Sequence, residues 1–115
     1  MEFYEHKPIY LQIADTLCDK VLSGEWVTED RIPSVRELGV ALGVNPNTIM
    51  RTYDHMQSTD VIYNKRGVGY FISPGSKASI IKTQKEQFIK EEIPKILKRL
   101  SLLGIKPSEI FSELK

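Results

Sequence analysis

The sequence predicts a mainly α-helical protein with one small β-hairpin, an α+β fold class. Apolar residues recur every three or four positions in three segments of the first 60 residues and again over 88–114, which is the period of amphipathic helices. Two short runs of β-branched and aromatic residues flank a glycine-containing turn near position 67, which indicates a hairpin. With 115 residues, of which 41% are hydrophobic, the chain is long enough for one modest core.

Composition excludes several classes of protein. One cysteine and two histidines rule out an internal disulfide and the usual structural zinc sites. The longest stretch without a charged residue, Leu38–Met50, has 13 residues, whereas a membrane span needs about 20. Residues Met1–Glu5 lack the basic and apolar regions of a secretion signal, so we expect a cytoplasmic protein.

Charge is distributed unevenly along the chain. The net charge of +1 divides into −5 for residues 1–30, +2 for residues 31–75 and +4 for residues 76–115. The positive charge therefore lies in the middle and at the end of the sequence. This is a weak basic footprint for a nucleic-acid-binding protein.

The first helix is predicted over residues 9–23. Pro8 precedes it, at a place where proline is tolerated, and Gly24 is a plausible end. The apolar stripe that faces the core has a spacing of four and consists of Ile9, Ile13, Leu17 and Val21. Cys18 lies beside this stripe, so we interpret it as a small core residue and not as a reactive thiol.

Two short helices follow, separated by a tight turn. Ser34 and Glu37 have the spacing of a capping box, which predicts that the second helix begins at Val35 and ends at Gly43. Asn45 as a cap and Pro46 in the first position predict the start of the third helix. The inward face of the third helix is predicted to contain Ile49, Tyr53 and Met56, and a separate face contains Asn47, Arg51 and Asp54.

A β-hairpin is predicted next, with strands at 61–63 and 70–72. Its tip is basic and contains glycine, because Lys65, Arg66 and Gly67 lie between the two runs. The breaking sequence 74–76 then predicts a domain boundary, with a head over residues 1–75 and a helical tail over residues 76–115.

The tail has an apolar seam with spacings of 4, 3, 4 and 3, formed by Ile89, Ile93, Ile96, Leu100 and Leu103. Phe88 and Leu97 reinforce it, and a last short helix contributes Ile110, Phe111 and Leu114. Pro94 predicts either a kink or a restart of the helix. Two helices cannot bury all of these side chains against each other, so we expect them to form the interface of a homodimer.

Helix, helix, turn, helix and hairpin form the order of a winged helix-turn-helix. Within it, the segments PIYLQI (8–13), IPSVREL (32–38), LGVNPNTIMR (42–51) and GVGYF (67–71) resemble the GntR family of bacterial transcription regulators over about two thirds of the chain. The short tail resembles the YtrA subfamily. This resemblance implies a homodimeric repressor that binds an inverted repeat in double-stranded DNA, and such regulators often control ABC transporter operons.

The resemblance also implies which residues contact DNA. They are Ser34, Arg36, Asn45, Asn47, Thr48, Met50, Arg51, Lys65, Arg66 and Gly67. Arg36 matches an arginine that contacts the DNA backbone, and Arg51 matches an arginine of the recognition helix that could pair with guanine. Asn45 is favoured as a cap, and Asn47 could serve either adenine contact or the helix start. Met50 stands where the family often has arginine, which suggests a different base preference.

A competing interpretation is a winged-helix docking module that binds proteins and not DNA, which the acidic first segment permits. An enzyme is not expected, because no catalytic set of Ser, His and Asp and no pair of buried acids emerges from the pattern. We expect no cofactor, no metal and no membrane partner. The sequence does not indicate whether a small-molecule effector exists.

Overall fold

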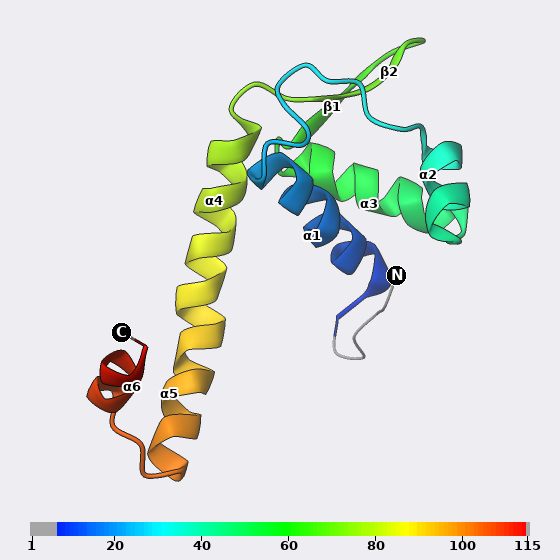
Figure 1. Cartoon of the computed structure of the whole chain (residues 1–115). Helices are drawn as coiled ribbons and strands as arrows, with labels where there is room; N and C mark the ends of the chain where they lie inside the picture. The colour runs from blue at the N-terminus through cyan, green and yellow to red at the C-terminus, as the bar shows by residue number, and fades with distance from the viewer. Residues whose placement is uncertain (1–6, 115) are drawn as a thin grey trace. The chain divides into compact units, whose positions relative to one another are not determined.

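The computed structural model describes residues 7–114, so Met1–Glu5 and their predicted lack of a signal lie outside the described residues. Its elements are α1 (Ile9–Leu22), α2 (Val35–Leu42), α3 (Pro46–Ser58), β1 (Ile62–Lys65), β2 (Gly69–Ile72), α4 (Ser76–Gln87), η1 (Phe88–Glu92), α5 (Ile93–Leu102) and α6 (Pro107–Glu113) (Figure 1). This order confirms the predicted fold class. The chain divides into two compact units, one ending at Ile81 and one beginning at Lys82.

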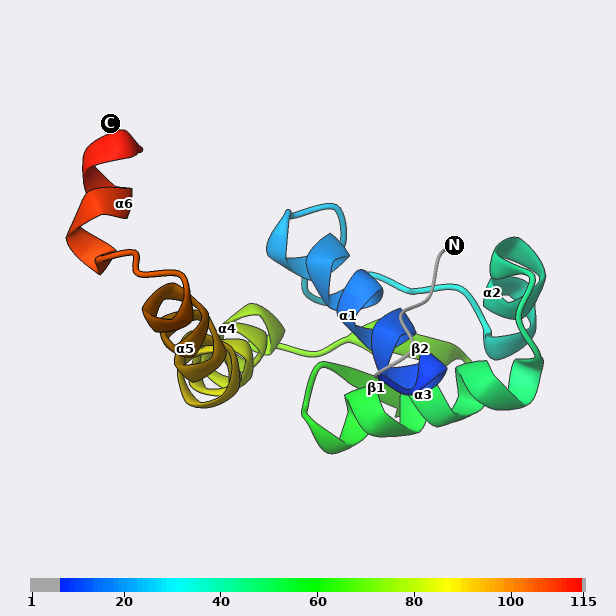
Figure 2. The same ribbon diagram turned by 90° about the horizontal axis from the view of Figure 1, so that it is seen from below.

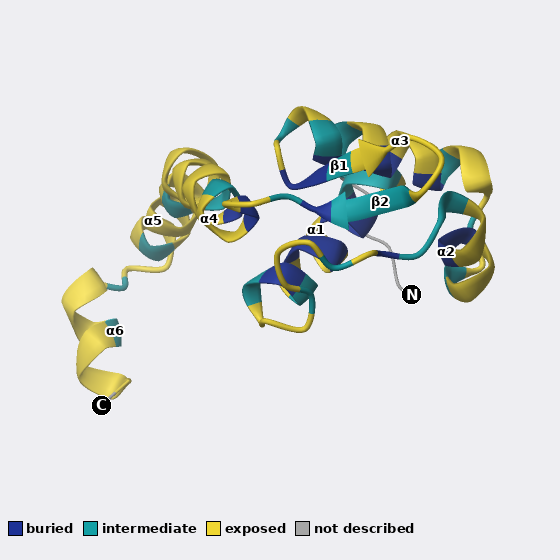
Figure 3. Cartoon of the chain, turned by 90° about the horizontal axis from the view of Figure 1, so that it is seen from above, coloured by how far each residue is buried: buried dark blue, intermediate teal, exposed yellow. Residues whose placement is uncertain are grey.

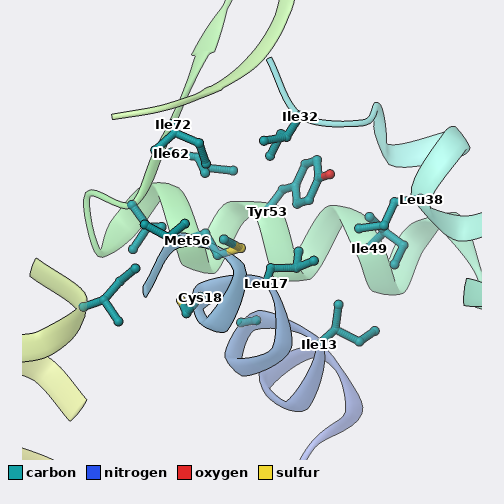
Figure 4. Close-up of a cluster of buried hydrophobic side chains, with 14 residues drawn as sticks. Ile13, Leu17, Cys18, Ile32, Leu38, Ile49, Tyr53, Met56, Ile62 and Ile72 are labelled. Carbon is teal, nitrogen blue, oxygen red and sulfur yellow. The ribbon is translucent and has the colours of Figure 1, made fainter. Parts of the chain in front are cut away.

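The first unit is built around α3. Helix α1 packs against it (Figure 2), and the two strands close the far side. Tyr53 lies near the middle of the core and is fully buried (Figure 4). The buried cluster consists of Ile13, Ala14, Leu17, Cys18, Val21, Ile32, Leu38, Ile49, Tyr53, Met56, Val61, Ile62, Ile72 and Ile80. The predicted inward face of the third helix is therefore confirmed, and so is that of the first helix at Ile13, Leu17 and Val21. Ile9 is predicted in the same stripe, but it is 46% exposed because it lies at the first residue of α1, beyond the end of the core.

Cys18 lies in this core, as predicted, and we expect its thiol to be unreactive in the folded protein. Burial, with a smaller contribution from Asp15 and Asp19, raises the pKa of Cys18 to about 12. The thiolate is the reactive form, so almost none is present at pH 8. Labelling with a thiol reagent at pH 8 should be slow in buffer and rapid in denaturant. Equal rates in both conditions would contradict the buried placement.

Gly39 allows the turn between α2 and α3 to be tight. A Cβ atom at Gly39 would lie 2.8 Å from the Val44 carbonyl oxygen, a backbone atom that cannot rotate away. The amide of Val44 donates to the Gly39 carbonyl over 2.9 Å, and Gly43 takes the left-handed conformation with φ of 66°. The helix-turn-helix angle therefore depends on the missing side chain at Gly39.

We expect Gly39→Ala to destabilise the fold even though alanine favours helices. The overpacking penalty of roughly 1–3 kcal/mol exceeds the helix-propensity gain of about 1 kcal/mol, which leaves a net loss of about 1 kcal/mol. Chemical denaturation would measure this loss. The adjacent, solvent-exposed Val40 supplies a matched control, since Val40→Ala should change stability by less than about 0.5 kcal/mol. A Gly39→Ala variant as stable as wild type would contradict the close contact.

The wing contains a third segment that the sequence does not predict. Strands β1 and β2 pair antiparallel, with Ile62 opposite Ile72 and Lys65 opposite Gly69, slightly longer than the predicted runs. Residues 30–32 then pair with β2, because the Ile32 amide donates to the Tyr70 carbonyl and the Ile72 amide donates to the Asp30 carbonyl, each over 3.0 Å. The wing is thereby attached to the segment that leads into α2.

The second unit is helical and exposed. Within residues 88–113 no side chain is buried, and α5 and α6 are predominantly yellow in Figure 3. Pro94 is the second residue of α5, and the turn before it, η1, is a π-helix in which the Ile93 amide donates to the Phe88 carbonyl. A wider turn avoids the clash between the proline ring and the Lys90 carbonyl that a regular α-helix would impose. Among the described residues, no helix is both long and apolar enough to cross a membrane.

Candidate nucleic-acid interface

The start of α2 is fixed by the predicted capping box. The Ser34 hydroxyl oxygen accepts from the Glu37 amide, and the Glu37 carboxylate accepts from the Ser34 amide, each over 3.1 Å. Hydrogen bonding to the Ser34 amide, and then to the Ser34 side chain, lowers the pKa of Glu37. Arg36 lies in the first turn of α2 and is exposed.

Helix α3 has a buried face and an exposed polar face. Ile49 and Tyr53 are buried, whereas Asn47, Met50 and Arg51 are exposed. The Tyr53 hydroxyl donates to the Pro33 carbonyl over 2.6 Å, which ties α3 to the entrance of α2. Burial raises the pKa of Tyr53, so the hydroxyl retains its hydrogen at neutral pH. The polar face is therefore held at a fixed orientation toward solvent.

The two asparagines at the start of α3 have different roles. The Asn45 side-chain oxygen accepts from the Asn47 amide over 2.8 Å, which confirms Asn45 as the cap. Asn47 contributes its backbone to that cap, and its exposed side chain is free of this bond. The structure thus leaves the Asn47 side-chain amide available for a base edge.

The Arg51 guanidinium lies over an aromatic ring. Its guanidinium carbon lies 4.2 Å from the centre of the Tyr10 ring, within the range of a cation–π contact. The first residues of α1 and the start of α3 enclose a depression of about 340 Å³ at this place. It is lined by Pro8, Ile9, Tyr10, Asn47, Thr48 and Arg51.

Met50 contacts the wing from α3. Its sulfur lies 3.9 Å from the Tyr70 hydroxyl, which donates to it. The Tyr70 ring in turn packs edge-on against Tyr53, with 4.8 Å between the ring centres. Met50 is 42% exposed, so an apolar contact from this side chain to a thymine methyl group is sterically open.

The tip of the wing is basic and has little bulk. Gly67 has φ of 78°, a conformation that residues with side chains rarely adopt, and a Cβ atom placed there would meet no atom within 4 Å other than those of its chain neighbours. Lys65 and Arg66 are exposed, and the Lys65 ammonium lies 5.9 Å from the centre of the Phe71 ring. The positive charges therefore flank the accessible backbone of the turn.

Two residues of this surface are not predicted by the sequence patterns. Tyr10 falls on the first helix, far from the recognition helix in sequence. Arg31 is exposed, and its guanidinium packs against Gly69. A Cβ atom added at Gly69 would lie 3.0 Å from the Arg31 Nε. No periodicity identifies either contact. All five Lys and Arg residues of segment 31–75 are exposed, namely Arg31, Arg36, Arg51, Lys65 and Arg66.

Residues 9–72 match the family described as bacterial regulatory proteins, gntR family. The chain belongs to the GntR family. Proteins of the GntR family are DNA-binding transcription regulators and not enzymes, so the competing interpretation as a docking module without DNA binding is not favoured.

This GntR-family chain is similar to two regulators of Bacillus subtilis (strain 168). It is 37% identical to the uncharacterized HTH-type transcriptional regulator YhcF over 99% of this chain and 93% of YhcF. It is 30% identical to the HTH-type transcriptional repressor YtrA over 94% of this chain and 82% of YtrA. The likeness to YtrA supports the predicted YtrA-like subfamily.

Solved structures share the fold. A GntR-family protein from Bacteroides thetaiotaomicron is 50% identical, with a TM-score of 0.76 over 91% of each chain. The DNA-binding domain of AraR, solved in complex with operator ORR3, is 23% identical, with a TM-score of 0.57 over 64% of this chain and 88% of that chain. At this identity the likeness to AraR concerns the fold alone.

Proposed function

We propose that the protein is a homodimeric, sequence-specific repressor that binds an inverted repeat in double-stranded DNA. The observation that supports this most directly is the exposed face of α3, where Asn47 and Arg51 are free to contact base edges while the opposite face is buried. Arginine binds guanine and asparagine binds adenine through paired hydrogen bonds in the major groove. Such a protein acts in the cytoplasm.

The proposed contacts divide into two groups. Arg36, Lys65, Arg66 and the backbone of Gly67 serve the phosphates and the minor groove, with Ser34 and Thr48 as hydroxyl donors. Arg51, Asn47 and Met50 serve the base edges. Asn45 contributes as the cap that presents this helix turn.

The dimer is proposed from the exposed apolar side chains of the tail. Ile89, Ile96, Leu97, Leu103 and Phe111 are each at least 46% exposed in a single chain, which is unusual for a monomeric protein of this size. A second copy of the same tail would cover them by two-fold symmetry. The interface would comprise Phe88, Ile89, Ile93, Ile96, Leu97, Leu100, Leu103, Ile110, Phe111 and Leu114. Two heads would then contact half-sites about 34 Å apart.

Selection from a pool of random duplexes at near-physiological salt tests the proposal. We expect enrichment of an inverted repeat, together with a steep loss of affinity as salt rises. Mapping the enriched repeat onto the genome would then test whether it lies at an ABC transporter operon. No enrichment by a folded, dimeric protein would overturn the proposed function.

A further inference from the structure

The Arg51 guanidinium contacts an aromatic ring, and not a carboxylate as in an ordinary ion pair. None of the described carboxylates forms an ion pair with Arg51, and its cationic group lies 4.2 Å from the Tyr10 ring centre. A carboxylate would occupy the N–H donors in the guanidinium plane. An aromatic ring contacts the face of the guanidinium, so the same donors remain available for a base edge.

The Tyr10 ring is itself held by α3. The Thr52 hydroxyl donates to the Tyr10 carbonyl over 2.9 Å, and Thr52 is fully buried. The His55 ring meets the Tyr10 ring at an interplanar angle of 79°, with 6.2 Å between the centres. Backbone and ring of Tyr10 are therefore both fixed by side chains that follow Arg51 on the same helix.

Rigid placement of Arg51 matters because its side chain is long. An unsupported arginine on an exposed helix face samples many rotamers, and fixing it against one base costs conformational entropy. A ring that holds the guanidinium in place before DNA arrives lowers this cost. The benefit falls on base discrimination, since discrimination by paired hydrogen bonds depends on the orientation of the guanidinium fork.

We propose that Tyr10 is a positioning residue for base selection, which orients the Arg51 guanidinium through its ring and leaves the N–H donors free. This inference rests on the proposed function and deepens it. It assigns to the first helix a part in sequence selection, in addition to its part in the core. Pro8, Ile9 and Tyr10, which line the depression beside Arg51, then form one side of the base-contacting surface.

The test compares Tyr10→Leu with Tyr10→Phe. The quantity measured is the ratio of affinities for the selected duplex and for a scrambled duplex of the same length. Leucine retains apolar bulk but lacks a π face, so this ratio should fall by roughly threefold to fivefold for each half-site. Phenylalanine retains the ring, so the ratio should stay at the wild-type value. The slope of affinity against salt and the thermal unfolding midpoint should be unchanged in both variants.

A double-substitution cycle with Arg51→Ala tests whether Tyr10 acts through Arg51. In the Arg51→Ala background, Tyr10→Leu should cause no further loss of selectivity. An equal loss in both backgrounds, a loss with Tyr10→Phe, or a shallower salt slope with Tyr10→Leu would each overturn the inference. If the wild-type protein is selective and Tyr10→Leu is equally selective, this inference alone is overturned. If the wild-type protein shows no selectivity, the proposed function is overturned.

Discussion

Arg51→Ala should remove most of the preference for the operator over a scrambled duplex, by roughly 10-fold to 100-fold for each half-site. The guanidinium of Arg51 is exposed and held over the Tyr10 ring, where its donors can meet the two acceptors of a guanine. The buried face of α3 does not include Arg51, so the variant should fold normally. Binding titrations with both duplexes at two salt concentrations would measure the effect.

Arg36→Ala supplies the matched control for this prediction. Arg36 is also exposed, but it lies at the start of α2, where a phosphate contact is proposed. Its loss should lower the affinity for both duplexes equally and reduce the slope of log affinity against log salt concentration by about one. If Arg51→Ala behaved in the same way as Arg36→Ala, Arg51 would be a phosphate contact and not a base contact.

Ile96→Lys should abolish the dimer and lower operator affinity by about 10²–10⁴-fold. Ile96 is 46% exposed in the single chain, so lysine there costs the monomer little. In the proposed dimer the same position is covered by the second copy, and an unpaired ammonium group would be buried. When two heads are linked in a dimer, binding of the first head to DNA raises the effective concentration of the second head at its half-site. A monomer lacks this increase, so its operator affinity should be lower.

Sedimentation and DNA titration together would check this prediction. Ser101→Lys adds the same charge to the same helix at a position outside the apolar seam, and it should leave both measurements unchanged. A dimeric Ile96→Lys protein would contradict the proposed interface. A monomeric Ile96→Lys protein with undiminished operator affinity would show that two linked heads are not needed.

Much of the head could be predicted because its signals are local. The capping box of Ser34 and Glu37, the cap at Asn45 and the glycine stop at Gly43 each involve residues a few positions apart, and the structure confirms them. Backbone sterics and short-range hydrogen bonds decide these features.

The contacts that the sequence patterns do not predict join residues that are far apart in the chain. Tyr10 and Arg51 meet because α1 packs across α3, and residues 30–32 pair with β2 without any alternating pattern of their own. Ile80 joins the core of the head although it follows the predicted boundary at 75. Such contacts depend on how elements pack in three dimensions, which a pattern within one segment does not encode. The proposed partner of the apolar tail is a second copy, so its contacts likewise lie outside a single chain.

The π-helical turn before Pro94 also changes the direction around the helix axis in which the later side chains of the tail project. A turn with one extra residue rotates everything on its far side by about 100°, given 3.6 residues per ordinary turn. The run from Ile89 to Leu103 keeps an unbroken heptad spacing in sequence, yet Ile89 lies within the π-helical turn and Ile93 begins α5. The regular spacing of an α-helical seam therefore applies from Ile93 onward and does not extend unchanged through the π-helical turn. In the proposed dimer, the second copy would have to fit Phe88 and Ile89 with a geometry that differs from the one it uses along α5.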